Sequence, residues 1–258
     1  MKISFCGRTD RGKRRPNNED DLAAVDLTAQ KVLDPIEAEA LPVAEHGILL
    51  AVCDGVGGAR AGEVASALAL ETLAHELESL ADGCPRRTLF GAAVEKVNER
   101  VWKQAHTEEK LAGMATTLTA AVVCRERAIF AHVGDSRAYF LRGGSIRQLT
   151  RDQSFVASLV ASGALTQEQA EHSPYRAVIL QAIGRARKVD VALDAIELEA
   201  GDLLLLCTDG LSDKVKAEEM AEALRTRSLR EAVERLIALA NDRGGDDNIT
   251  VLAARVEE

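Results

Sequence analysis

Several common functional signatures are missing from this sequence. Its cysteines form no C-x-x-C pair, and its five histidines show neither H-x-x-x-H nor H-E-x-x-H spacing. Both absences disfavour a zinc site. The chain also has no basic-then-apolar leader and no apolar run approaching about 18 residues, so we expect neither a secretion signal nor a membrane span.

An excess of positive charge is also missing. The formal net charge is −9 at pH 7. Nucleic acids and anionic membranes both bind cationic surfaces, so we expect neither as a partner.

The five cysteines are an odd number and lie far apart in the sequence. Cys53, Cys124 and Cys207 fall within or at the end of apolar, strand-like runs. This pattern is typical of reduced core cysteines, and we therefore expect these three to be free thiols in a cytoplasmic protein.

The remaining composition fits one folded domain over residues 1–258. The chain is 47% hydrophobic and 28% charged, enough to bury a sizeable core, and it contains no repeat or low-complexity linker. Apolar alternation and β-branched residues predict strands at 2–9, 22–25, 47–53, 116–124, 128–133, 136–141, 146–150, 189–198, 203–207 and 249–256. Apolar residues at helical spacing predict helices at 60–81, from Pro85 to about 101, at 217–227 and at 229–242.

Two segments interrupt this pattern. Residues 26–46 contain two prolines and several acids, and we expect an irregular excursion there. Residues 151–184 predict two short helices between strands, which fits either a lid over a site or a solvated helical connection. Successive short strands without helices between them indicate antiparallel pairing, so the fold class is α+β.

Four aspartates recur in one kind of position. Asp54, Asp135, Asp209 and Asp247 each lie at or beside a predicted strand end, next to glycine or a turn residue. Strands of one sandwich end together at its rim, so these carboxylates can converge, and converged acids need bound cations. Oxygen ligands without paired His or Cys favour Mg²⁺ or Mn²⁺ over zinc.

A nucleotide-binding loop is one alternative. Residues 7–13 fit the pattern G-x-x-x-x-G-K, but Arg14 occupies the following Ser/Thr position. Pro16 and two asparagines also disfavour the helix whose N-terminus would hold the phosphates. Nucleotide hydrolysis is therefore disfavoured.

Short motifs in the chain resemble, in order, those of the metal-dependent protein serine/threonine phosphatases of the PP2C type, most closely their compact bacterial branch. These are Arg15-x-x-x-Glu19-Asp20, Asp54-Gly55-x-Gly57-Gly58, Met114-Ala115-Thr116-Thr117, Gly134-Asp135-Ser136-Arg137, Leu149-Thr150-Arg151-Asp152, Ala182-Ile183-Gly184, Gly201-Asp202, Thr208-Asp209-Gly210-Leu211 and Asp247-Asn248-x-Thr250. The resemblance extends from Thr9 to the last strand.

The resemblance implies a four-layer α-β-β-α sandwich of two antiparallel sheets flanked by helix pairs, with a flap at about 151–184. It also implies two or three Mn²⁺ or Mg²⁺ ions per chain. By position in the motifs, Asp54 bridges two metals, the Gly55 carbonyl binds one of them, and Asp209 and Asp247 complete the other. Asp135 with Asp209 forms a third and weaker site, and Glu19 and Asp20 hold metal-bound waters. Arg15 binds the substrate phosphate.

The chain departs from the family pattern at a few positions. Val56 stands where many eukaryotic members have a histidine that serves as general acid, and a valine cannot donate a proton. Gln153, Ala177 and Ala115 replace a usual histidine, asparagine and glycine. These changes concern the flap geometry and the choice of substrate more than catalysis.

We therefore expect a cytoplasmic Mn²⁺- or Mg²⁺-dependent phosphatase that acts on phosphoserine and phosphothreonine in proteins. The expected enzyme is a monomer that opposes a serine/threonine kinase. A non-catalytic phosphate- or phosphopeptide-binding regulator with the same fold is the alternative from a different functional class.

Overall fold

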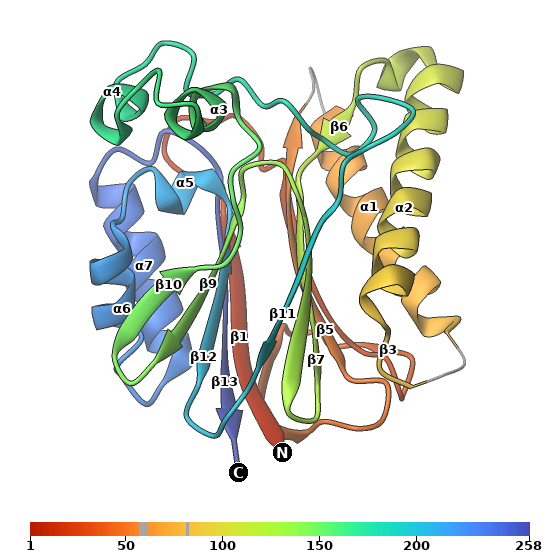
Figure 1. Cartoon of the computed structure of the whole chain (residues 1–258), viewed down its shortest axis with the longest axis vertical. Coiled ribbons are helices and arrows are strands. Elements are labelled where there is room, and N and C mark those ends of the chain that lie inside the picture. The colour runs from red at the N-terminus through yellow and green to blue at the C-terminus, as the bar shows by residue number, and fades with distance from the viewer. Residues whose placement is uncertain (57–60, 81–82) are drawn as a thin grey trace.

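Two antiparallel sheets lie face to face, and a pair of helices covers the outer face of each (Figure 1). The structure is a computed structural model that describes residues 1–56, 61–80 and 83–258. The predicted α+β class and four-layer sandwich are confirmed. Gly57, Gly58 and the predicted helix ends at Arg60 and Ala81 lie outside the described residues.

The first sheet has β13 and β1 near its centre. Its strand order is β10 (Ser145–Gln148), β9 (Arg137–Arg142), β12 (Leu203–Cys207), β13 (Ile249–Glu257), β1 (Lys2–Asp10) and β4 (Glu37–Pro42). Strands β1 and β13 pair along their whole length, from Lys2 opposite Glu257 to Asp10 opposite Ile249. Residues at the two extremes of the chain therefore form the middle of this sheet.

The second sheet carries strand β5 at its centre. Its order is β11 (Ala192–Glu197), β8 (Arg127–Val133), β7 (Leu118–Cys124), β5 (Ile48–Val56), β2 (Asp20–Asp26) and β3 (Lys31–Val32), and the short β6 (Ala115–Thr116) also pairs with β5. The prediction of an irregular segment at 26–46 was wrong where β3 and β4 lie. The register of β1 with β4 shifts between Ile3 and Phe5, so the β4 sequence lacks a clean period of two.

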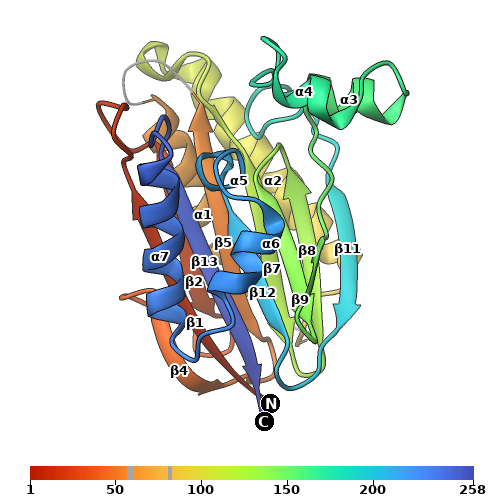
Figure 2. The same cartoon turned by 90° about the vertical axis from the view of Figure 1, so that its left-hand side faces the viewer.

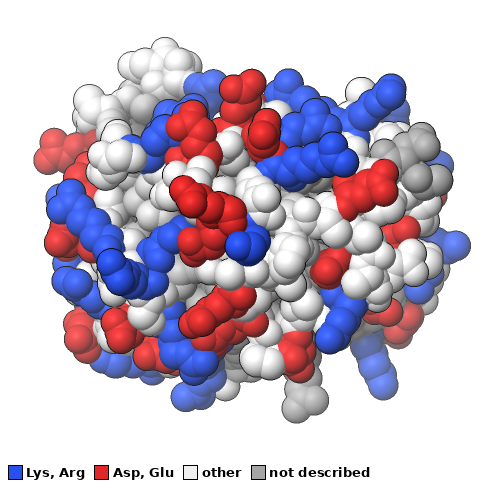
Figure 3. Space-filling model, turned by 90° about the horizontal axis from the view of Figure 1, so that it is seen from below, with Lys and Arg blue, Asp and Glu red and all other residues white. Residues whose placement is uncertain are grey.

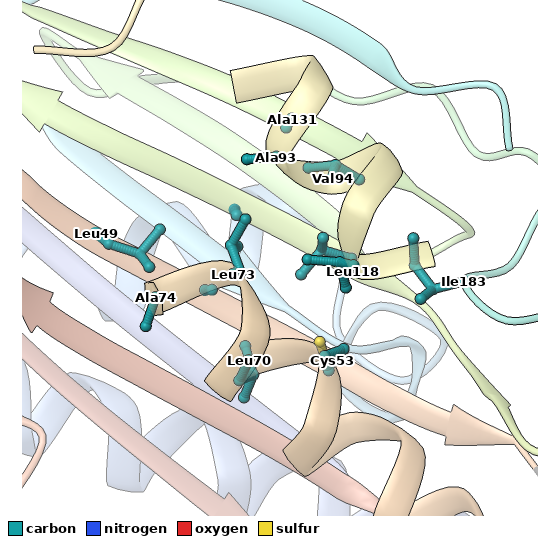
Figure 4. Packing of buried hydrophobic residues seen from close by; sticks show 14 of the residues in the cluster. Leu49, Cys53, Leu70, Leu73, Ala74, Ala93, Val94, Leu118, Ala131 and Ile183 are labelled. Carbon is teal, nitrogen blue, oxygen red and sulfur yellow. The ribbon is translucent and has the colours of Figure 1, made fainter. Parts of the chain in front are cut away.

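Helices α1 (Ala61–Glu78) and α2 (Arg87–Thr107) cover the second sheet, and α6 (Ala217–Ala223) and α7 (Leu229–Asp242) cover the first (Figures 1 and 2). Figure 4 shows Leu70 and Leu73 of α1 beside Leu49 of β5 and Leu118 of β7. These side chains are at most 5% exposed, so the hydrophobic effect holds α1 on the sheet. Four shorter helices complete the described elements: η1 (Glu109–Leu111), α3 (Phe155–Ala161), α4 (Gln167–Glu171) and α5 (Asp209–Ser212).

One of the cysteine predictions was wrong. Cys124, at the end of β7, forms a disulfide with Cys84, which precedes α2. The two residues are 40 positions apart, and nothing in that spacing shows that their chain segments meet. Cys53 and Cys207 are buried free thiols, as predicted.

Charged side chains of both signs are mixed on the end of the molecule that carries the two termini (Figure 3). A hollow of about 1030 Å³ lies at this end, next to Cys84 and Cys124, and contains none of the predicted site residues. Among the described helices, none has both the length and the apolar character required to cross a bilayer.

Candidate metal centre

Acidic residues from both sheets meet at the end of the sandwich that lies under α3 and α4 (Figure 1). Asp54 lies near the end of β5, directly opposite Asp20 of β2 in the strand register. Asp135 lies in the turn between β8 and β9, Asp209 is the first residue of α5, and Asp247 precedes β13. The structure thus brings together the four aspartates singled out in the sequence.

Burial and the mutual repulsion of these acids raise their pKa values. Burial raises the pKa of Asp54 well above its ordinary value, and the charges of Asp20 and Asp209 raise it further. Burial also raises the pKa of Asp209, reinforced by Asp135. It raises the pKa of Asp20 to about 7 and that of Asp135 to about 6. Nearby cations would favour the charged form of every one of these groups.

Two of these carboxylates also have an oxygen without a partner. Asp135 Oδ1 and Asp209 Oδ1 are buried and make no hydrogen bond within the part of the chain that the structure describes. A buried acceptor without a partner is costly, and a hard cation would satisfy both. The donor set therefore fits Mn²⁺ or Mg²⁺.

Among the described residues, no group of three or more His, Cys, Asp or Glu side chains is placed so that the group could hold one metal ion. Mg²⁺ commonly keeps several waters and takes only one or two carboxylates, so the absence of an all-protein cage agrees with the chemistry of this donor set.

Hydroxyl groups from the opposite sheet hold Asp20. Its Oδ2 accepts hydrogen bonds from Thr208 Oγ1 at 2.8 Å and from Thr250 Oγ1 at 2.7 Å. Thr208 follows β12 and Thr250 belongs to β13, whereas Asp20 belongs to β2. These two bonds therefore connect the two sheets directly beneath the acids.

The backbone around Asp54 is fixed by two threonines. The Asp54 amide donates to Thr117 Oγ1 at 2.9 Å, and the Asp54 carbonyl accepts from Thr116 Oγ1 at 2.9 Å. At the next residue, a Cβ on Gly55 would lie 2.3 Å from the Gly62 carbonyl oxygen. Only glycine fits there, and this close packing places the Gly55 backbone beside α1.

The loop between β1 and β2 brings Arg15 and Glu19 to the same end. Arg15 Nη2 donates to Asp247 Oδ2 at 2.6 Å, and this bond raises the pKa of Arg15. The Glu19 amide donates to Asn248 Oδ1 at 2.8 Å. Residues after Lys13 form turns up to β2, without the helix that a nucleotide-binding loop requires.

Asn248 organises this loop and was not assigned a role from the sequence. Its Nδ2 donates to the carbonyls of Arg11 and Asn17, both at 2.9 Å, while its Oδ1 accepts from Glu19. Thr116, Thr117, Thr208 and Thr250 were likewise not assigned roles. All five residues belong to the recognised motifs, and that membership is the only signal the sequence offered.

A groove of about 510 Å³ leads from the acids to the flap. Asp135, Asp209 and Asp247 lie at one end of it, and Val156, Val160 and Ala170 of the flap line the other. Residues of the segment 151–184 therefore line the same groove as three of the acids. Val56 lies near this end of β5, with a side chain that is 44% exposed.

Comparison with known proteins gives one consistent result. Residues 38–251 match the family model described as protein phosphatase 2C. The chain is 40% identical over 256 residues to the serine/threonine protein phosphatase PstP of Mycobacterium tuberculosis, covering 99% of this chain and 45% of PstP. The chain thus spans about half the length of that relative. It is 37% identical to the serine/threonine phosphatase stp of Listeria monocytogenes, covering 95% of this chain and 92% of stp.

Solved structures agree with these sequence matches. A crystal structure of M. tuberculosis PstP has a TM-score of 0.85 at 39% identity and covers all of both chains. The PstP catalytic domain in complex with two manganese ions has a TM-score of 0.82 at 38% identity, covering 100% of this chain and 99% of that one. Together with the confirmed sandwich and the family model, these matches show that the chain belongs to the protein phosphatase 2C family.

Proposed function

We propose that this chain is a metal-dependent phosphatase that removes phosphate from phosphoserine and phosphothreonine in proteins. The observation that carries the proposal is the set of carboxylates from both sheets, two of which have a buried oxygen without a partner. We further propose that residues 1–258 act as one domain, with 151–184 as the flap over its groove.

The proposed ligands follow from this arrangement. Two or three Mn²⁺ or Mg²⁺ ions would be held by Asp54, the Gly55 carbonyl, Asp209, Asp247 and Asp135, with Glu19 and Asp20 acting through water. When bound, such ions supply the positive charge that makes a water molecule reactive toward phosphorus near neutral pH. Asp20 suits a water-mediated role because Thr208 and Thr250 both donate to its Oδ2 and neither uses its Oδ1.

Arg15 would bind the substrate phosphate. Its guanidinium reaches Asp247 and is about half exposed, so it lies where both the acids and the groove are accessible. A guanidinium offers two parallel N–H donors to phosphate oxygens and neutralises charge in the transition state. Val56 has no acidic proton to donate, so the proton for the departing alkoxide would come from water in the groove.

The proposed substrates are phosphorylated proteins, and the proposed opposing enzyme is a serine/threonine kinase. We propose a monomeric chain without a nucleic acid partner. The cytoplasmic location stays a prediction: buried free thiols at Cys53 and Cys207 agree with it, whereas reducing compartments disfavour the disulfide of Cys84 with Cys124.

Hydrolysis of a phosphothreonine peptide by the purified chain, with Mn²⁺ present or chelated, tests the proposal. We expect phosphate release that requires the metal and that Asp209→Asn abolishes. Asp194→Asn is the matched control, because it makes the same chemical change on β11, where Asp194 forms an ion pair with Arg87. Binding of the peptide without release, by protein shown to be folded, would replace the enzyme with the phosphopeptide-binding regulator.

A further inference from the structure

Gln153, at the start of the flap, joins three separate parts of the chain. Its backbone amide donates to the Gly134 carbonyl at 2.7 Å, and its side-chain Oε1 accepts from the Gly134 amide at 2.8 Å. Its Nε2 donates to the Asp190 carbonyl at 3.1 Å, and its own carbonyl accepts from the Leu180 amide at 2.8 Å. All four hydrogen-bonding groups of this residue therefore bind backbone atoms elsewhere.

The Gly134 end of this connection leads directly to a proposed metal ligand. Gly134 has a φ of +113°, and a Cβ on it would lie 2.6 Å from Thr117 Cγ2. The residue is thus held between the β6–β7 connection on one side and Gln153 on the other. The next residue is Asp135, whose Oδ1 is buried and unpartnered. With no hydrogen bond to that oxygen, the position of Asp135 depends on the backbone that Gln153 holds.

The other end of the connection leads to the return of the flap. Leu180 and Asp190 lie on the chain between α4 and β11, where the flap rejoins the second sheet. The Asp190 amide also donates to Gln181 Oε1 at 3.3 Å. Gln153 therefore ties the entry of the flap, its return and the turn that carries Asp135 into one unit.

We propose that Gln153 is the positioning residue that couples the flap to Asp135 and thereby sets the affinity of the cation held by Asp135. The inference rests on the proposed function and deepens it. The amide side chain offers one acceptor for Gly134 and one donor for Asp190 at the same time; a glutamate keeps the first bond and loses the second. Groups that orient a metal ligand typically change metal affinity by about 10–100-fold when removed.

Direct titration of Mn²⁺ into the full chain by calorimetry, without substrate, tests the coupling. We expect Gln153→Ala to weaken the most weakly bound Mn²⁺ by about 10–100-fold and to leave the tighter ions within about twofold. Gln153→Glu keeps the bond to the Gly134 amide and adds a negative charge near Asp135, so it should bind the weakest Mn²⁺ no more weakly than wild type, although it loses the bond to Asp190. Gln181→Ala is the matched control, because it loosens the Asp190 end without touching Gly134.

If Gln153→Ala and Gln181→Ala weaken Mn²⁺ binding equally, the coupling through Gly134 is wrong and a general loosening of the flap explains the loss. Unchanged Mn²⁺ binding in Gln153→Ala would overturn it as well. Asp135→Asn separates this failure from failure of the proposed metal site. If Asp135→Asn removes the weakest Mn²⁺ but Gln153→Ala does not, only the coupling is wrong; if Asp135→Asn changes nothing, the assignment of Asp135 fails and the coupling fails with it.

Discussion

Replacing His132 should reduce the loss of stability that the protein suffers in mild acid. His132 lies on β8, fully inside the sandwich, and its Nδ1 shares a hydrogen bond of 2.9 Å with Thr119 Oγ1. Its Nε2 is buried without a partner. Burial lowers the pKa of His132 to about 4, against the opposing charge of Asp152 and the carbonyls of Arg151 and Gly134.

The sign follows from proton binding in the two states. The unfolded chain takes up a proton at His132 below about pH 6.5, whereas the folded chain does so only below about pH 4, so acid favours unfolding between these values. At about pH 5 this difference increases the ratio of unfolded to folded protein by a factor of about 30. The free energy of unfolding therefore falls by about 2 kcal/mol relative to neutral pH.

Urea unfolding in a metal chelator, at about pH 8 and about pH 5, measures this difference. Other buried acids titrate in the same range, so the informative quantity is wild type compared with His132→Gln, which keeps a hydrogen-bonding group near Thr119. The variant should lose about 2 kcal/mol less on acidification than wild type. His75→Gln, on the exposed face of α1, is the control and should change nothing. Equal acid sensitivity of wild type and His132→Gln would refute the reasoning.

Three further changes test other parts of the structure. Cys84→Ala removes the disulfide between residues 40 positions apart, and loop entropy predicts that the free energy of unfolding falls by about 4 kcal/mol. Thermal unfolding with and without a thiol reductant measures this loss. An unchanged midpoint on reduction of wild type would contradict the disulfide. Gly134→Ala should destabilise by more than about 2 kcal/mol, because φ is +113° and Thr117 leaves no room; a smaller loss in denaturant unfolding would contradict that packing. Asn248→Asp keeps the acceptor for the Glu19 amide but loses both hydrogen bonds that Nδ2 donates to the loop carrying Arg15. KM for a phosphopeptide should therefore rise several-fold. An unchanged KM would show that the position of this loop does not depend on the Asn248 donors.

Much of the fold could be predicted from the sequence because its elements obey simple periodicities. Strand β12 and helix α7 lie where the apolar pattern placed them, at 203–207 and 229–242. The recurrence of aspartates at strand ends predicted the gathering of Asp54 with Asp209, and the family motifs added the stacking of two sheets.

The features that the sequence did not predict have physical reasons. Strand β4 lies at a sheet edge with a shifted register, and its alternation of polar and apolar residues lasts only from Glu37 to Ala40. The partner of Cys124 depends on how the α1–α2 connection passes the end of β7, which is a tertiary property. Gln153 makes its bonds to backbone atoms, and such atoms leave no trace in the identity of their residues.

The pairing of β1 with β13 also bears on how the protein is synthesised. Thr250 reaches Asp20 only when β13 has entered the sheet, and β13 is read by the ribosome some 240 residues after β1. The first sheet therefore cannot close around its central strand while the chain is still being translated through residue 248, and β1 must wait with an unpaired edge. A nascent chain would consequently acquire its complete set of acids in a single late step.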